Sequence, residues 1–397
     1  MQVKVAFASI AAGSLLVASA AGSVDPRPPS GARFAEAVPT DPQVPIAYLV
    51  DLSSGAVLHA RNDTRRFVPA SITKVMTLFV AFEMIAAGEL DPSQHFPISD
   101  QAFSAWDNVG STMFITAGST VSVDNLLRGI ATVSANDGSV VLAEGAAGSV
   151  AGWVARMNVA ARELGMRDSH IGTPNGWADE GRTFTSARDL AVLGSAMISR
   201  HPELYARYIG QAEFSYNGIS QPNRDPISGS VNGADGIKTG FTNQAGHGFL
   251  GSAVRDGRRL MMVVAGAESN RARNRLARDL IEWGFARTRA RVLFASGEVI
   301  GQALVQGGEV LSVPLMAGNS PISAAQPDAS GNPDVTLTIR YDGPLRAPIA
   351  EGEKVADLEI SVAGMPTSHA PLYAAQDVGK AGSITRFKNG LAGLFRW

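Results

Sequence analysis

The stretch that decides the fold covers residues 69–87 and reads PASITKVMTLFVAFEMIAA. Its apolar side chains fall on every side of a helix, and Glu83 is its only acidic residue. A helix that is apolar all round is typical of a segment buried in the core of a large domain. Pro69 precedes the helix, Ser71 is a possible N-cap, and Gly88 is a stop signal.

Lys74 stands in the first turn of this apolar helix, where a charge is costly unless something there uses it. Ser71 lies three residues earlier, so both side chains emerge on one face. A hydroxyl beside a desolvated amine is a nucleophile beside its base. Because Ser-x-x-Lys is common by chance, this interpretation needs further motifs to support it.

Two such motifs follow in the chain, Ser134-Ala135-Asn136 and then Lys238-Thr239-Gly240. Together with Ser71-x-x-Lys74, and in this order, they resemble the motif set of penicillin-binding proteins and class A β-lactamases. From Tyr48 to about Phe285 the chain resembles the low-molecular-mass penicillin-binding proteins of the type-5 D-alanyl-D-alanine carboxypeptidase family.

Other segments share this resemblance and two positions depart from it. The matching segments are Tyr48-Leu49-Val50-Asp51, Ser186-Ala187-Arg188-Asp189 and Asp235-Gly236-Ile237. Phe241 follows the Lys-Thr-Gly motif where the family often has His, and Asn175-Gly176 stands where a His-Gly pair is common.

The resemblance implies an α/β fold of the β-lactamase/DD-peptidase type over residues 41–287, with an antiparallel sheet and helices on both sides. Local patterns agree with this expectation, since strand signals lie near residues 46–62 and 230–268 and most of 71–200 has helical patterns. Short alternating runs after Arg291 predict a small β-rich domain over residues 293–378. The individual predictions are helices at Val150–Leu164, Ala187–Arg200 (capped by Ser186) and Asn270–Phe285, and a hairpin turn at Arg255-Asp256-Gly257.

The resemblance also implies catalytic roles. Ser71 would form an acyl ester, Lys74 would be its base, and Ser134 would relay a proton to the leaving D-alanine. Asn136 would hold the Lys74 amine and the substrate amide, and Lys238 would orient Ser134. For Lys74 to act as a base its pKa must fall from about 10.4, and both burial and a second cation nearby lower it.

The substrate-binding residues implied by the resemblance are Lys238, Thr239, Gly240, Phe241 and Arg224. Thr239 would bind the terminal carboxylate, and Gly240 would leave room for the substrate backbone. The main-chain N–H groups of the nucleophile and of Phe241 would form the oxyanion hole. Arg224 would clamp a carboxylate, although a solvated surface arginine is an equal alternative.

These roles predict a serine-type D-alanyl-D-alanine carboxypeptidase. It would remove the terminal D-alanine from peptidoglycan pentapeptide, and β-lactam antibiotics would inhibit it covalently. A class A β-lactamase would need a Glu to activate water, and no Glu-x-x-Leu-Asn segment lies between Ser134 and Lys238. A D,D-endopeptidase usually lacks the C-terminal parts. The intact motifs argue against a non-catalytic peptidoglycan- or β-lactam-binding protein.

Both ends of the chain carry targeting signals. Residues 1–20 resemble a signal peptide, with Lys4, an apolar run and Ala18-Ser19-Ala20 as a cleavage site; a short membrane anchor is the alternative. Residues 380–397 predict an amphipathic basic helix that lies on a membrane surface, or else docks on its own protein. We therefore expect an exported, peripheral protein on the periplasmic face of the inner membrane. The apolar positions of that helix are Ile384, Phe387, Leu391, Leu394 and Phe395.

Composition excludes several other classes of function. A net charge of −2 carries no electrostatic footprint for nucleic acid. With no cysteine and no H-E-x-x-H segment, the sequence predicts neither a thiolate nor a zinc mechanism, and we expect no cofactor. The G-x-G-x-x-G match at residues 246–251 lies inside a strand pattern, so the dinucleotide-binding context is absent.

Overall fold

The computed structural model describes residues 2–5, 37–327, 334–363 and 365–382. The chain divides into two compact units. The first comprises Val38–Ser53 and Val57–Ala286. The second comprises the chain from Arg287 onward, together with Ser54–Ala56 and the N-terminal residues. All three sequence motifs belong to the first unit.

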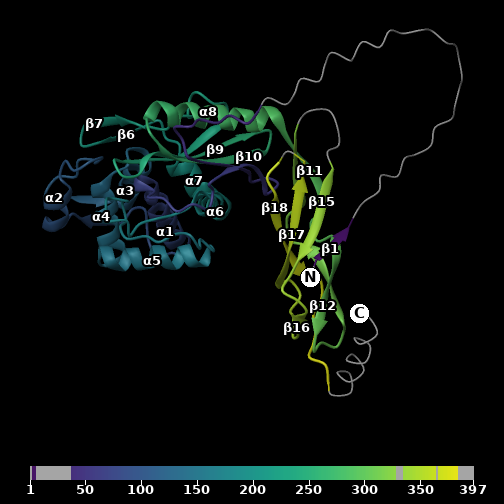
Figure 1. The fold of residues 1–397 in the computed structure, drawn as a ribbon. Helices are drawn as coiled ribbons and strands as arrows, with labels where there is room; N and C mark the ends of the chain where they lie inside the picture. The colour runs from purple at the N-terminus through teal and green to yellow at the C-terminus, as the bar shows by residue number, and fades with distance from the viewer. Residues whose placement is uncertain (1, 6–36, 328–333, 364, 383–397) are drawn as a thin grey trace, which may run out of the picture. The chain divides into compact units, whose positions relative to one another are not determined.

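A five-stranded sheet in the order β3-β2-β10-β9-β8 runs through the first unit (Figure 1). β10 pairs antiparallel with both β2 and β9, and β8 pairs antiparallel with β9. Arg258 pairs with Arg255 across the turn at Asp256-Gly257, which is the predicted hairpin. The strands are β2 (Ile46–Asp51), β3 (Ala56–Arg61), β8 (Ala234–Thr242), β9 (Gly246–Arg255) and β10 (Arg258–Ala267).

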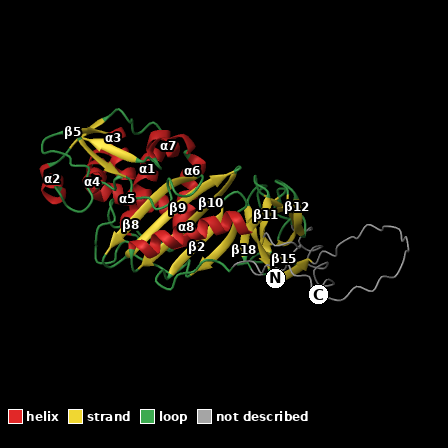
Figure 2. Ribbon diagram, turned by 90° about the horizontal axis from the view of Figure 1, so that it is seen from above, coloured by secondary structure: helices red, strands yellow, loops and turns green. Residues whose placement is uncertain are grey.

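Helices cover both faces of this sheet, with α8 along one face and α6 on the other (Figure 2). Successive residues of β10 point to opposite faces. A Cβ on Gly284 of α8 would lie 2.7 Å from Leu260, whereas a Cβ on Gly194 of α6 would lie 2.7 Å from Met261. The two glycines therefore let both helices pack closely on the sheet. The predicted antiparallel sheet between helices is confirmed.

Further helices and short strands complete the first unit around α1, the predicted buried helix. All residues of α1 are buried except Glu83, Ile85 and Ala86. The helices are α1 (Lys74–Ala86), α2 (Asp100–Trp106), α3 (Val123–Thr132), α4 (Asn136–Ala147), α5 (Val150–Glu163), α6 (Ala187–Arg200), α7 (Pro202–Tyr208) and α8 (Asn270–Arg287). Two further two-stranded antiparallel sheets pair β4 (His95–Pro97) with β5 (Thr120–Ser122) and β6 (Glu213–Tyr216) with β7 (Ile219–Pro222).

The start of α1 differs from the predicted N-cap at Ser71. Ser71 lies inside a 3-10 turn, η1 (Ala70–Thr73), and α1 begins only at Lys74. No side chain caps either helical segment, because the Ser71 hydroxyl instead contacts the Lys74 amine. Ala70, immediately before the serine, has a φ of 49°, which is uncommon for a residue with a side chain. The turn thus places the Ser71 hydroxyl beside the Lys74 amine, and Ser71 does not cap the helix.

The second unit is rich in β-structure, as the alternating sequence predicts. Its seven-stranded sheet has the order β1-β15-β17-β18-β13-β12-β16, and β11 and β14 form a separate pair. Buried residues recur at every second position of β17, and they include Leu358 and Ile360. The strands are β1 (Gln2–Val5), β11 (Thr288–Phe294), β12 (Val299–Gln306), β13 (Ser312–Ala317), β14 (Ile322–Pro327), β15 (Val335–Arg340), β16 (Leu345–Arg346), β17 (Lys354–Val362) and β18 (Ser368–Ala374).

The two expected targeting segments lie mostly outside the described residues. Of the expected signal peptide, only residues 2–5 are described, and they form β1, antiparallel to β15. The expected helix at residues 380–397 is described only as far as residue 382. Within the described ranges, no single helix combines the length and hydrophobicity of a membrane span; α4 and α5 do so only as a pair bent by 88°.

Candidate active site

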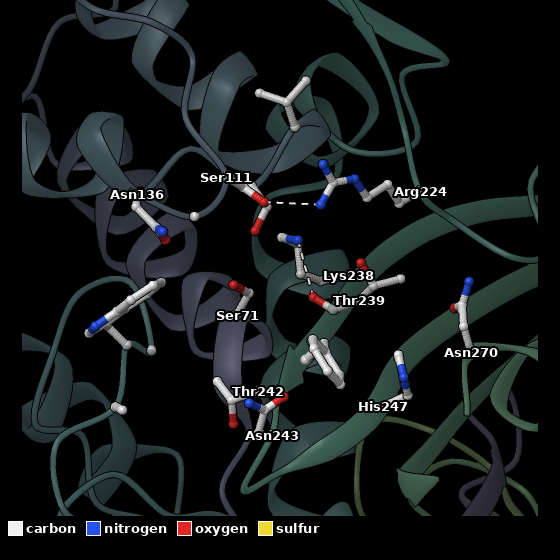
Figure 3. A pocket seen from close by; sticks show the side chains of 18 of the residues that line it. Ser71, Ser111, Asn136, Arg224, Lys238, Thr239, Thr242, Asn243, His247 and Asn270 are labelled. Atoms are coloured by element: carbon white, nitrogen blue, oxygen red, sulfur yellow. Dashed lines mark hydrogen bonds between the residues drawn. The ribbon is translucent and has the colours of Figure 1, made fainter. Parts of the chain in front are cut away.

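The three motifs converge on one cavity of about 1000 Å³ in the first unit (Figure 3). Three separate parts of the fold supply them: η1 with the start of α1, the loop from α3 into α4, and β8. Lys74 lies beneath the cavity lining, fully buried, and reaches it through Ser71. Every other predicted site residue lines the cavity: Ser71, Ser134, Asn136, Arg224, Lys238, Thr239, Gly240 and Phe241.

The Lys74 amine has three hydrogen-bond partners. Its Nζ lies 3.0 Å from Ser71 Oγ, 2.8 Å from Asn136 Oδ1 and 2.6 Å from the Asn175 main-chain oxygen. The amide oxygen and the carbonyl oxygen can only accept hydrogen bonds, whereas a hydroxyl can also donate. A neutral amine would therefore direct its two N–H groups to Asn136 and Asn175, and its lone pair would face the Ser71 O–H.

The electrostatic surroundings of Lys74 favour this neutral form. Burial disfavours the ammonium, and the nearby Lys238 cation adds repulsion, so the pKa of Lys74 is held well below its ordinary value. The Asp137 carboxylate acts in the opposite direction without reversing the shift. Lys74 thus has the position of a general base for Ser71, and its lowered pKa favours that role.

Lys238 and Ser134 face the same cavity, but they are not hydrogen-bonded to each other as the sequence interpretation expected. Lys238 Nζ donates to the main-chain oxygen of Thr239 at 3.2 Å. The buried Ser134 hydroxyl has no hydrogen-bond partner within the described ranges, and Ser134 itself has a φ of 65°. A buried hydroxyl left unpaired at a strained position is costly. The Ser134 hydroxyl is therefore available for a hydrogen bond with a bound ligand.

Burial also acts on Lys238, and two arginines add to its effect. Together with the Arg224 and Arg273 guanidinium groups, burial lowers the pKa of Lys238 to about 7. Asp225 opposes this shift. Near neutral pH, Lys238 can therefore hold or release a proton with little free-energy difference.

Gly240 lies against the turn that carries Ser71. A Cβ on Gly240 would lie 2.5 Å from the Pro69 carbonyl oxygen and 3.2 Å from the Ile72 nitrogen. Gly240 thus permits a close approach between β8 and the turn that carries Ser71. Only glycine lets this strand lie against the turn. The sequence identified the residue, but the packing partner comes from elsewhere in the chain.

Arg224 lines the cavity, and its side chain is exposed to solvent. Its Nη1 donates to Ser111 Oγ at 3.0 Å. The Ser111 segment is in turn anchored by buried Asp137, which accepts hydrogen bonds from the N–H groups of Met113 and Ile115. In Figure 3, Arg224 and Ser111 lie at one end of the cavity, with Ser71 and Lys238 between them and the Thr242–Asn243 end.

Two contributors to the site were missed by sequence reasoning. Arg273 lines the cavity, is almost fully buried, and donates to the Gly248 carbonyl oxygen at 3.0 Å. A signal existed, because Arg273 falls on the apolar face of α8 with Leu276 and Leu280. Asn175 contributes its main-chain oxygen to Lys74. Since every residue type carries this oxygen, no sequence pattern marks it.

The described residues contain no group of three or more His, Asp or Glu side chains placed to hold a metal ion. The chemistry that the observed side chains can perform is nucleophilic attack by Ser71 with Lys74 as base. The fold and the site therefore fit a serine acyl-transfer enzyme in which a lysine lies beside the serine.

Comparison with known proteins specifies the class further, and the chain belongs to the D-alanyl-D-alanine carboxypeptidase family. The model of this family matches residues 35–269, and the model of the penicillin-binding protein 5 C-terminal domain matches residues 290–380. The predicted family, fold class and enzyme class, a serine-type D-alanyl-D-alanine carboxypeptidase, are confirmed.

Individual relatives match over most of their length. The D-alanyl-D-alanine carboxypeptidase DacD of Salmonella typhimurium is 34% identical over 91% of this chain and 94% of its own. Penicillin-binding protein 5 from Haemophilus influenzae has a similar structure, with a TM-score of 0.70 and 31% identity over 87% of this chain and all of its own. Penicillin-binding protein D2 from Listeria monocytogenes, solved in its ampicillin-bound form, has a TM-score of 0.56 and 29% identity over 61% of this chain and 97% of its own.

Proposed function

We propose that Ser71 is the nucleophile with which this carboxypeptidase removes the terminal D-alanine from a peptidoglycan stem peptide ending in D-Ala-D-Ala. The observation that carries the assignment is the Lys74 amine, which is fully buried and lies 3.0 Å from the Ser71 hydroxyl. Its other two partners are acceptors only, so deprotonation leaves its lone pair directed at Ser71. Catalysis requires no cofactor in this proposal.

The first half of the reaction forms an ester. Lys74 Nζ takes the proton from Ser71, and Ser71 Oγ attacks the carbonyl carbon of the penultimate D-alanine. The main-chain N–H groups of Ser71 and Phe241 stabilise the oxyanion, a contribution of about 3 kcal/mol per donor. As the C–N bond breaks, Ser134 passes a proton to the leaving D-alanine nitrogen. The unpaired Ser134 hydroxyl and the Lys238 pKa of about 7 support this relay.

The remaining site residues hold the substrate. Asn136 orients both the Lys74 amine and the substrate amide, and Gly240 keeps β8 against the turn of Ser71. Thr239, Lys238 and Arg224 bind the terminal carboxylate, because they bring a hydroxyl and two cations to the cavity. Water then hydrolyses the ester and releases a peptide one residue shorter.

A β-lactam would acylate Ser71 by the same attack, with its ring C–N bond in place of the peptide bond. The relative from Listeria monocytogenes, whose structure was solved in its ampicillin-bound form, supports this part of the proposal. Because the opened ring stays attached to the acyl group, the inhibitor keeps the site occupied.

We also propose that residues 1–20 direct export and that the 380–397 segment attaches the protein peripherally to the periplasmic face of the inner membrane. The apolar periodicity of the segment and its basic residues Lys380, Arg386, Lys388 and Arg396 support this attachment. The protein would thereby stay close to newly made peptidoglycan.

Replacing the nucleophile tests the assignment. Ser71→Ala should abolish both covalent labelling by a fluorescent penicillin and D-alanine release from a D-Ala-D-Ala pentapeptide, because no ester can form. Ser53→Ala, at a serine outside the cavity, is the control and should retain both activities. Covalent labelling of folded Ser71→Ala protein would show that another residue is the nucleophile.

A further inference from the structure

The end of α3 carries a second buried hydroxyl group close to that of Ser134. Thr132 is the last residue of α3 and lines the active-site cavity. Only 4% of Thr132 is exposed, and its Oγ1 has no hydrogen-bond partner among the described residues. The Ser134 hydroxyl, two residues further along the chain, is buried and unpaired in the same way. Two unpaired hydroxyl groups therefore lie on one short segment of the cavity wall.

Main-chain hydrogen bonds hold this segment in place. The N–H groups of Val133 and Ala135 both donate to the Gly129 carbonyl oxygen, each at 3.1 Å. A threonine in a helix commonly donates its hydroxyl to the carbonyl oxygen one turn earlier, but the Thr132 hydroxyl makes no such bond. Because burying an unpaired hydroxyl is costly, Thr132 needs a partner that its own segment does not supply.

The partner that fits Thr132 is a water molecule. Its Oγ1 is enclosed by protein, so only a small group can reach it. A water molecule donates and accepts hydrogen bonds, as a hydroxyl does, and a bound water needs at least two polar partners. Thr132 and Ser134 together offer two such partners within the same cavity.

The second half of the proposed reaction requires a held water. Each polar group of the substrate has partners in that reaction, whereas the water that hydrolyses the ester has none. By microscopic reversibility, water enters on the side of the carbonyl carbon from which the amine departs. Ser134 faces that side, because it passes the proton to the leaving nitrogen. A water that replaces the departed D-alanine therefore arrives beside Ser134.

We propose that the hydroxyl groups of Thr132 and Ser134 together hold the water that hydrolyses the Ser71 ester, and that Thr132 is a positioning residue for this half of the reaction. The inference rests on the proposed function and deepens it. The water oxygen bonds to the carbonyl carbon, the bond from that carbon to Ser71 Oγ breaks, and the proton that the water loses ends on Ser71 Oγ. Thr132 exchanges no proton in this step and only fixes the water within reach of the ester.

Thr132→Val tests this role, because it removes the hydroxyl and nearly keeps the shape of the side chain. Labelling by fluorescent penicillin should proceed as in wild type, since the first half of the reaction uses no water. Loss of the label by hydrolysis should slow about tenfold, the effect of losing one hydrogen bond. Thr132→Ala should behave in the same way, whereas Thr132→Ser keeps a hydroxyl and should restore hydrolysis.

An amine that competes with water separates positioning of the water from a general disturbance of the site. D-methionine can accept the acyl group from an N-acylated peptide ending in D-Ala-D-Ala, because its carboxylate can be held as that of the leaving D-alanine is. Its attack therefore does not depend on Thr132. In Thr132→Val the ratio of D-methionine-ending peptide to hydrolysed peptide, measured by mass spectrometry, should rise about tenfold.

A matched control makes the same change elsewhere. Thr338→Val replaces a buried threonine of β15 in the second unit and should leave the ratio of the two products unchanged. Thermal unfolding checks that every variant is folded.

The outcomes separate this inference from the proposed function. An unchanged product ratio in Thr132→Val, or equal slowing of hydrolysis and of attack by D-methionine, would overturn the inference and leave the carboxypeptidase assignment intact. Ester formation that slows as much as hydrolysis would also overturn it, because Thr132 would then support the site as a whole. If wild-type protein formed no ester with penicillin and released no D-alanine, the proposed function would fail and this inference with it.

Discussion

Lys74 and Lys238 are buried close together, and their neighbours give them different tasks. Lys74 is surrounded by oxygen acceptors, and its pKa is lowered by burial and by Lys238. Lys238 faces the cavity together with two arginines, and its pKa is lowered to about 7. Lys74 is therefore suited to act as a base, whereas Lys238 is suited to act as a cation that can donate its proton near neutral pH.

The base can be tested by a change that keeps the charge. Lys74→Arg should lower the rate of acylation by fluorescent penicillin about a thousandfold, within the range typical for loss of a general base. A guanidinium does not deprotonate at accessible pH, so it cannot accept the Ser71 proton. Lys354→Arg, in the second unit, is the matched control and should acylate normally. Acylation of Lys74→Arg within about tenfold of wild type would mean that another group is the base.

The pH dependence tests Lys238. If its ammonium attracts the substrate carboxylate, kcat/KM for the peptide should fall as the pH rises through about 7, where Lys238 loses its proton. Arg224→Gln removes a cation that repels the ammonium, so the pKa of Lys238 rises. The fall in kcat/KM therefore moves to higher pH. Profiles from about pH 6 to about pH 9 measure both effects. Arg162→Gln is the control and should leave the pH of this fall unchanged. If Arg224→Gln also leaves it unchanged, the fall does not report the Lys238 ammonium.

At the scale of elements, the active site depends on how closely β8 lies against η1. Gly240→Ala should lower the free energy of unfolding by about 1–3 kcal/mol and slow penicillin acylation, because the new Cβ would push the strand away from the Pro69 carbonyl. Thermal unfolding and labelling kinetics measure the two effects.

Gly248 offers a matched control, because it pairs with Gly240 across the β8–β9 ladder. The nearest atom to a Cβ on Gly248 would be the end of the Ile72 side chain, at 3.0 Å, whereas the nearest main-chain atom, the Val264 oxygen, would be at an ordinary contact distance of 3.5 Å. Gly248→Ala should therefore be milder in both measurements. Equal effects of the two variants would show that the strand-to-turn contact does not govern the geometry of Ser71.

At the scale of the whole molecule, the chemistry and the expected membrane attachment reside in different parts of the chain. Deletion of residues 381–397 should abolish flotation with anionic vesicles and leave D-alanine release almost unchanged. In the expected helix the deleted apolar residues would insert one face into the membrane, and each basic residue near an anionic surface adds about 1 kcal/mol that is sensitive to salt. Equal flotation of full-length and truncated protein would mean that this segment docks on the protein itself.

The sequence by itself determined the candidate nucleophile, its proposed base and the order of the three motifs, because these are properties of side chains at short spacing. Ser71 and Lys74 share one helical face wherever the segment packs. The α8 helix and the β9–β10 hairpin were likewise predictable, since periodicity and turn residues are local. The second unit was predictable as β-rich from its alternation, whereas its strand order was not.

Only the tertiary structure decided which distant groups complete the site. The Asn175 oxygen at Lys74 and the Pro69 oxygen against Gly240 are main-chain atoms, which are the same in every residue type and leave no trace in the sequence. The unpaired Ser134 hydroxyl and the approach of Arg273 depend on where α3, α8 and β8 meet. Such contacts join segments far apart in the chain, so the packing of elements, rather than any local pattern, fixes them.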